Sequence, residues 1–158
     1  MTPVQTPTAN IVLAAINARY RHTSFGLRYL MANLGALETQ AVLVETSLQQ
    51  STDGIVERIL APKPKIVGLG VYVWNAVQAL EVVRTLKARS PDTVVVLGGP
   101  EVSHEWEDQE IVRLADYTVC GEGEAAFRTL CEELLSGARP ERRIWPGATP
   151  PMEELSFP

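Results

Sequence analysis

Residues 66–75, IVGLGVYVWN, decide the fold class that this sequence predicts. The first part is apolar at nearly every position, as expected of a parallel strand that is buried on both faces. Gly68 and Gly70 lie inside it, where glycine weakens a strand unless another group must approach the backbone closely. Tyr72 and Trp74 follow near its carboxyl end, which is the edge where open α/β sheets bind their ligands. We therefore expect a ligand site at this edge.

Four other apolar runs have the composition of buried strands, and each of the five is followed by a segment with helical periodicity. Besides the strand that begins at Ile66, the runs cover residues 10–16, 41–45, 93–97 and 117–120, and the helical segments include 51–61 and about 105–114. Five alternations of strand and helix imply right-handed crossovers and helices on both faces of a parallel sheet. We predict a three-layer, doubly wound α/β fold, flavodoxin-like or Rossmann-like, with five parallel strands in the order 2-1-3-4-5. The loops after strands 1 and 3 should then flank the ligand crevice.

The length of 158 residues suits one domain with a short extension. Residues 1–9 are rich in Thr and Pro, and we expect them to be extended or disordered, with no secretory signal. Residues 10–137 hold the alternating elements and form the α/β domain. Residues 138–158 change composition towards Pro and Arg, which indicates a linker that leads into a further domain.

The composition of the chain argues against several kinds of binding partner and metal site. The net charge of −5 argues against a nucleic-acid surface, which needs a basic footprint. No apolar run approaches the roughly 18–20 residues that cross a membrane. The only cysteines, Cys120 and Cys131, indicate a reducing cytoplasm rather than a disulfide scaffold. Two scattered thiols and two scattered histidines give no zinc-binding spacing.

The sequence lacks the motifs of the common nucleotide sites. Gly68 and Gly70 lie within the strand, and Val73 replaces the third glycine of a dinucleotide fingerprint. The first strand leads into Asn17 and Ala18 without a glycine cluster that could hold a phosphate. A phospho-receiver domain would need a carboxylate after the third strand, where Tyr72 lies.

Two glycine-rich loops follow the fourth and fifth strands. Gly98-Gly99-Pro100-Glu101 indicates a sharp turn, and Gly121-Glu122-Gly123-Glu124 precedes the last helix. Turn geometry alone explains the glycines, and the acidic residues suit a helix amino terminus. Both loops also offer bare backbone to a broad, flat ligand, so the two interpretations stay open.

Taken together, three segments resemble the amino-terminal cobalamin-binding domain of cobalamin-dependent radical SAM enzymes. These segments are VGLGVY at 67–72, LGGPE at 97–101 and VCGEGE at 119–124. The resemblance covers about residues 10–137. It implies that cobalamin lies across the carboxyl edge of the sheet, with its nucleotide tail reaching down beside the strands near Gly68 and Gly70. The C-x3-C-x2-C motif of a radical SAM barrel is absent, so the 4Fe–4S cluster and S-adenosylmethionine are expected only in a missing carboxyl-terminal domain.

The resemblance also implies a set of cofactor contacts, with Tyr72, Trp74 and Asn75 facing the lower side of the corrin. The full candidate set is Asn17, Arg19, Tyr20, His22, Ser24, Gly70, Tyr72, Trp74, Asn75, Gly98, Gly99, Pro100, Glu101, Gly121, Glu122 and Gly123.

One departure concerns the lower ligand of cobalt. Many cobalamin domains carry D-x-H-x-x-G after the first strand, but Tyr20 and Phe25 occupy the positions of its Asp and Gly around His22. His22 therefore lacks the carboxylate that would orient and polarise its imidazole. We expect that no protein histidine binds the cobalt and that no catalytic or metal-ligating residue lies in this domain.

The leading hypothesis is a cobalamin-binding module of a radical SAM enzyme that transfers a methyl group, with its partner the radical SAM domain of the same polypeptide. In such an enzyme the cofactors carry the chemistry, so the domain alone should have no turnover. The alternative is a cofactor-free structural or docking domain of the same fold. A free-standing flavodoxin-like carrier is a third hypothesis, weakened by the missing phosphate loop.

Overall fold

The fold is a single parallel sheet between two layers of helices. The structure, a computed structural model, describes residues 7–18, 25–147 and 155–158. Its strands have the order β2-β1-β3-β4-β5-β6, and every neighbouring pair is parallel. The strands are β1 Ile11–Asn17, β2 Ala41–Ser47, β3 Ile66–Gly70, β4 Val94–Gly98, β5 Tyr117–Cys120 and β6 Ile144–Pro146. The predicted α/β class and the order 2-1-3-4-5 are confirmed.

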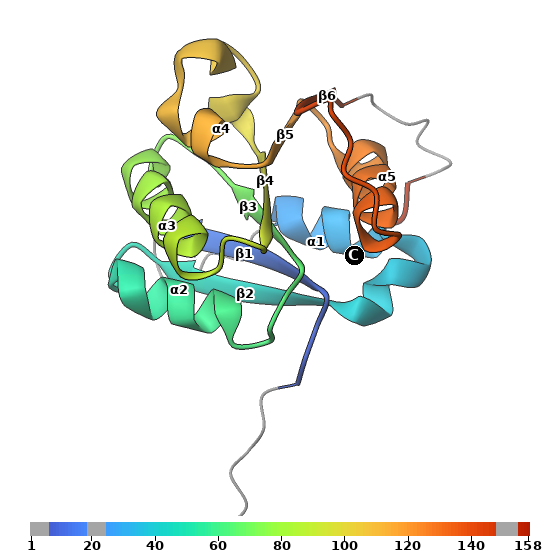
Figure 1. Ribbon diagram of the computed structural model, residues 1–158, viewed down its shortest axis with the longest axis horizontal. Coiled ribbons are helices and arrows are strands. Elements are labelled where there is room, and N and C mark those ends of the chain that lie inside the picture. The colour runs from blue at the N-terminus through green and yellow to red at the C-terminus, as the bar shows by residue number, and fades with distance from the viewer. Residues whose placement is uncertain (1–6, 19–24, 148–154) are drawn as a thin grey trace, which may run out of the picture.

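Helices cover both faces of this sheet (Figure 1). Helices α2, α3 and α4 pack on one face, and α1 and α5 pack on the other. The helices are α1 Phe25–Ala32, α2 Thr52–Leu60, α3 Ala76–Arg89, α4 Glu110–Leu114 and α5 Glu124–Leu135, with short 3₁₀ helices η1 Gly35–Gln40, η2 Pro100–Val102 and η3 Trp106–Asp108. The helix predicted at 105–114 is therefore split into η3 and α4.

Alternate strand residues supply the two halves of the core. On β1, Val12 and Ala14 pack towards α2 and α3, while Ile11 and Leu13 pack towards α1 and α5. All five residues of β3 are buried. Burial on both faces is the reason these strands are apolar throughout rather than alternating with polar residues.

A sixth strand lies within the stretch that was predicted to be a linker. Ile144–Pro146 pairs with β5, and its central Trp145 is buried against the α5 side of the core. The Trp145 indole donates a hydrogen bond to the Arg142 carbonyl, 2.8 Å away. Sequence reasoning missed this strand because it is short and proline-rich. At an edge position proline leaves no ladder hydrogen bond unmade.

The last described residues lie against α1. The Asn33 side chain donates to the Ser156 carbonyl and accepts from the Ser156 amide, both at 2.9 Å. Phe157 meets Tyr29 edge to face, with ring centroids 5.8 Å apart. One amide side chain thus holds both main-chain groups of Ser156, and these contacts fix residues 155–158 along the helix.

Asn75 joins the ends of β1 and β3. Its side-chain oxygen accepts from the Tyr72 amide at 2.8 Å, and its nitrogen donates to the carbonyls of Ile16 and Gly70 at 3.1 and 3.2 Å. The residue is 1% exposed and directly precedes α3. Buried amides need such partners, since an unpaired one costs about the free energy of a lost hydrogen bond.

Gly99 lets β4 turn against the exit of β3. Its φ is +101°, and a Cβ there would lie 2.5 Å from the Val71 carbonyl oxygen and 2.9 Å from its nitrogen. The adjacent Glu101 amide donates to that same carbonyl at 3.3 Å. Backbone conformation and close approach both require glycine here.

Replacing Asn75 by Ala should lower the free energy of unfolding by about 2–3 kcal/mol, because three buried hydrogen bonds are lost together. Gln78→Ala is the matched control on the same helix, since Gln78 makes one half-buried bond to Thr52. It should cost less than about 1 kcal/mol. Urea denaturation followed by circular dichroism measures both; equal effects would contradict the joining role of Asn75.

Gly99→Ala should destabilise the protein by about 2–4 kcal/mol, since Ala at this φ is strained and its methyl group meets the Val71 backbone. Gly98→Ala is the control. A Cβ at Gly98 meets only the Val119 carbonyl oxygen, at 3.8 Å, so its cost should stay below about 1 kcal/mol. Thermal unfolding of both variants tests the contrast, and a Gly99→Ala protein as stable as the parent would disprove it.

Candidate functional site

The site is built on glycines that face α1 and α5. Gly68 and Gly70 on β3 and Gly98 on β4 point to this face, because they alternate with residues packed towards α2 and α3. Gly70 and Gly98 are direct neighbours in the register of the two strands. No side chain therefore rises from the sheet at this point of its carboxyl edge.

The three glycines differ in what lies above them. Leu13 and Phe127 pack over Gly68, since a Cβ there would lie 3.0 and 3.2 Å from them. The Tyr72 ring lies over Gly70, since a Cβ at Gly70 would lie 3.0 Å from it. Above Gly98 the space is open apart from the Val119 carbonyl oxygen. Gly98 thus forms the bare part of the floor.

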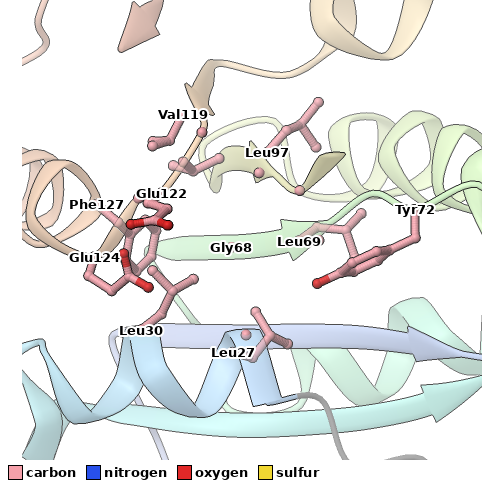
Figure 2. A pocket seen from close by; sticks show the side chains of 17 residues that line it. Leu27, Leu30, Gly68, Leu69, Tyr72, Leu97, Val119, Glu122, Glu124 and Phe127 are labelled. Carbon is pink, nitrogen blue, oxygen red and sulfur yellow. The ribbon is translucent and has the colours of Figure 1, made fainter. Parts of the chain in front are cut away.

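A pocket of about 160 Å³ opens above this floor, between the sheet, α1 and α5 (Figure 2). The volume is many times the roughly 10–15 Å³ that one water molecule needs. Most of the lining is apolar or bare backbone. It consists of Gly26, Leu27, Leu30, Gly68, Leu69, Gly70, Tyr72, Val96, Leu97, Gly98, Gly99, Val119, Gly121, Glu122, Gly123, Glu124 and Phe127. Such a slot suits a flat, largely apolar group.

Tyr72 covers one end of the pocket. Its hydroxyl reaches α1, where a Cβ at Gly26 would lie 3.2 Å from it. Burial raises the pKa of the Tyr72 phenol, so the hydroxyl stays neutral and can donate a hydrogen bond. Trp74 stacks on the Tyr72 ring, with centroids 4.5 Å apart and planes 8° apart.

Trp74 lies outside the pocket and is 49% exposed. Val73 and Val77 beside it are 76% and 83% exposed. An apolar surface therefore continues from Tyr72 out of the pocket and onto the start of α3. This exposed strip lies on the same rim as the pocket.

The opposite end of the pocket carries two carboxylates. Figure 2 shows Glu122 and Glu124 at the α5 end, away from Tyr72. Gly123 precedes α5 without a side-chain cap, and a Cβ there would lie 2.9 Å from Val119. Carboxylates at a helix amino terminus are electrostatically favourable. They also give the apolar slot one polar end.

The structure brings seven of the predicted site residues together. The residues that line the pocket are Gly70, Tyr72, Gly98, Gly99, Gly121, Glu122 and Gly123. Among the described residues, Asn17, Trp74, Asn75, Pro100 and Glu101 do not line it. Arg19, Tyr20, His22 and Ser24 lie outside the described residues, so their predicted contacts stay predictions.

Asn75 requires a correction. It was predicted to face the lower side of the corrin, but its amide is buried and its polar atoms bond to Ile16, Gly70 and Tyr72. The structure gives Asn75 the task of holding the strand ends in place. Its position directly after two aromatic residues suggested a pocket mouth, whereas the backbone turns there and directs the amide inwards.

Sequence reasoning missed the walls of the pocket. Leu27 and Leu30 on α1, Val119 on β5 and Phe127 on α5 line it, as does Glu124. Their apolar periodicity was interpreted as core packing, which it partly is. Only the arrangement of glycines on one face of β3 and β4 could have indicated that part of this layer stays open.

A larger hollow of about 710 Å³ lies at the amino edge of the sheet, but its cations are already bonded. Lys87 donates to Asp116 and to two carbonyls, and Arg143 donates to four carbonyls around the end of α4. These hydrogen bonds hold together the loops at this edge of the sheet.

The described residues contain neither a cluster of metal ligands nor a reactive thiol. They contain no group of three His, Cys, Asp or Glu side chains that could hold a metal ion. Burial raises the pKa of Cys131 to about 12 and that of Cys120 above its ordinary value, so both remain protonated thiols at neutral pH. Within the same described part of the chain, no helix is long and apolar enough to cross a membrane.

Two relatives resemble this chain in sequence. The cobalamin-dependent radical SAM methyltransferase TokK of Streptomyces tokunonensis is 34% identical over 114 residues, which is 70% of this chain and 15% of the relative. The 2-(S-pantetheinyl)-carbapenam-3-carboxylate methyltransferase of Streptantibioticus cattleyicolor is 35% identical over 98 residues, which is 61% of this chain and 14% of the relative. The chain thus matches only a small part of the length of either protein.

Two solved structures share the fold. A cobalamin-binding protein from Desulfitobacterium hafniense DCB-2 superposes with a TM-score of 0.57 at 22% identity, covering 79% of this chain and 58% of that one. The methanol:cobalamin methyltransferase complex MtaBC of Methanosarcina barkeri also gives 0.57, at 15% identity, covering 87% and 51%. The model of the B12 binding domain family matches residues 11–131, and on this evidence the chain belongs to the B12 binding domain family.

Proposed function

We propose that this chain binds cobalamin as the cofactor module of a radical SAM methyltransferase. The open floor at Gly98, under a pocket between the sheet, α1 and α5, carries the proposal. The pocket would accept the nucleotide tail, and the residues at the carboxyl edge would hold the corrin. When bound, cobalamin supplies a cobalt centre that can carry a methyl group; the residues of this chain supply position and a low-dielectric surface.

The residues present fit such a cofactor. A side chain at Gly98 would occupy the space that the tail needs, and the lining is mostly apolar, as a flat aromatic base requires. Tyr72 offers a neutral hydroxyl at one end, and Glu122 and Glu124 offer acceptors at the other. The stacked Tyr72 and Trp74 rings then support the lower side of the corrin.

The alternative is a structural domain without a cofactor. A domain of that kind would be more stable if side chains filled the pocket, because the apolar lining would then be removed from water. Leu, Val or Ala at position 98 would fill part of it without backbone strain. Glycine at position 98, where the space above the strand is open, therefore favours ligand binding.

We also propose that the module works beside a radical SAM domain in the same polypeptide, and that the chain leads towards it after β6. Support comes from the two relatives, of which this chain matches only 15% and 14%. The 4Fe–4S cluster and S-adenosylmethionine would belong to that domain. The protein would be located in the cytoplasm, consistent with the two free thiols, Cys120 and Cys131.

Enlarging Gly98 tests cobalamin binding directly. The parent chain should retain hydroxocobalamin through gel filtration, and Gly98→Leu should bind it roughly ten-fold more weakly or worse, because the side chain fills the slot. Gly98→Ala should lie between the two. Absorbance titration measures the affinities, and melting temperatures check that each variant folds. Failure of the folded parent chain to retain cobalamin would overturn the proposed function.

The ligation of cobalt provides a second test. With the tail in the slot and no histidine ligand, cob(II)alamin bound to the chain should show no nitrogen splitting in its electron paramagnetic resonance spectrum. His22→Ala should give the same spectrum. A nitrogen triplet that His22→Ala removes would show histidine ligation, and a triplet that persists would place the tail base on cobalt instead of in the slot.

A further inference from the structure

One carboxylate oxygen in the pocket wall has no partner. Glu124 Oε2 is buried, and no hydrogen bond reaches it from the described residues. Glu124 is the first residue of α5 and lines the pocket together with Leu30 and Phe127. Figure 2 shows the Glu124 carboxylate on the pocket wall, among the side chains of Glu122, Leu30 and Phe127.

The electrostatics of a helix amino terminus explain why an acidic residue occupies position 124. They do not explain why one of its carboxylate oxygens is buried. A first-turn carboxylate is stabilised by the amino end of a helix whether it is solvated or not. Glu122 is exposed, so water can satisfy its carboxylate. Burying one oxygen of Glu124 without a partner costs free energy, because the atom loses water and gains no donor. Such a group needs a donor from a molecule in the pocket, which is water in the free chain and a group of the ligand when one is bound.

We propose that Glu124 accepts a hydrogen bond from an N–H or O–H group of the ligand in this pocket. The inference rests on the proposed function, since cobalamin carries donors of both kinds. The corrin rim bears amide side chains with N–H groups, and the nucleotide tail bears ribose O–H groups. Either donor would satisfy Oε2 and fix the position of the ligand along the slot.

Glu124 is therefore a positioning and selectivity residue rather than a catalytic one. Leu30 and Phe127 favour any flat apolar group, whereas an unpaired acceptor favours a group that carries a donor. A ligand that fits the slot but lacks the donor leaves the acceptor unpaired and binds more weakly. The pocket can thus distinguish ligands of similar shape.

Affinities of the 158-residue chain for two corrinoids test the proposal. Cobalamin carries both kinds of donor, and cobinamide keeps the amide side chains but lacks the nucleotide tail. Glu124→Ala should bind cobalamin roughly ten-fold or more weakly, as expected for a lost hydrogen bond to a charged group. Glu124→Gln retains an acceptor oxygen, so its loss should be smaller. Glu132→Gln is the control, since Glu132 lies exposed on the same helix and bonds to Arg128.

The two corrinoids identify the donor. A loss confined to cobalamin places it on the nucleotide tail, and an equal loss for cobinamide places it on a corrin amide. The melting temperature of unligated Glu124→Gln should stay within about 4 °C of the parent. Glu124→Ala that binds cobalamin within two-fold of the parent would overturn this inference and leave the proposed function standing. A parent chain that binds neither corrinoid would overturn both.

Discussion

The absence of side chains at Gly70 and Gly98 is the constraint on which the site depends. These residues are adjacent in the register of β3 and β4 and face the same layer of helices. A parallel sheet normally fills this layer with side chains from every second residue. Here the helices α1 and α5 bury their apolar stripes around a gap at the carboxyl edge, where the fold places its ligand site.

The strand ends must hold their shape for that gap to persist. Asn75 bonds the exits of β1 and β3, and Gly99 lets the backbone after β4 lie against Val71. Both act at the carboxyl ends of the strands, next to the pocket. The Tyr72 side chain, just after β3, is therefore held over Gly70 and points towards α1. Its ring stacks on that of Trp74. The strand ends thus hold the stacked Tyr72 and Trp74 rings in place at the edge of the sheet.

Sequence reasoning predicted the architecture well because buried parallel strands carry a strong local signal. Strands β1, β2, β4 and β5 were located within two residues at each end and β3 at its first residue, and the order followed from the alternation of strand and helix. The edge strand Ile144–Pro146 escaped because three residues carry too little pattern. Within the site, glycines after β4 and β5 were found, whereas Leu30 and Phe127 were not, because a pocket wall and a packed core have the same periodicity. The direction of the Asn75 amide depends on backbone turns that local composition does not encode.

A crystal structure of the chain soaked with hydroxocobalamin tests the central claim most directly. The account predicts electron density for the nucleotide tail in van der Waals contact with the backbone of Gly98, between α1 and α5, with Tyr72 and Trp74 on the lower side of the corrin. Density for cobalamin elsewhere on the surface, with the slot above Gly98 empty, would contradict it.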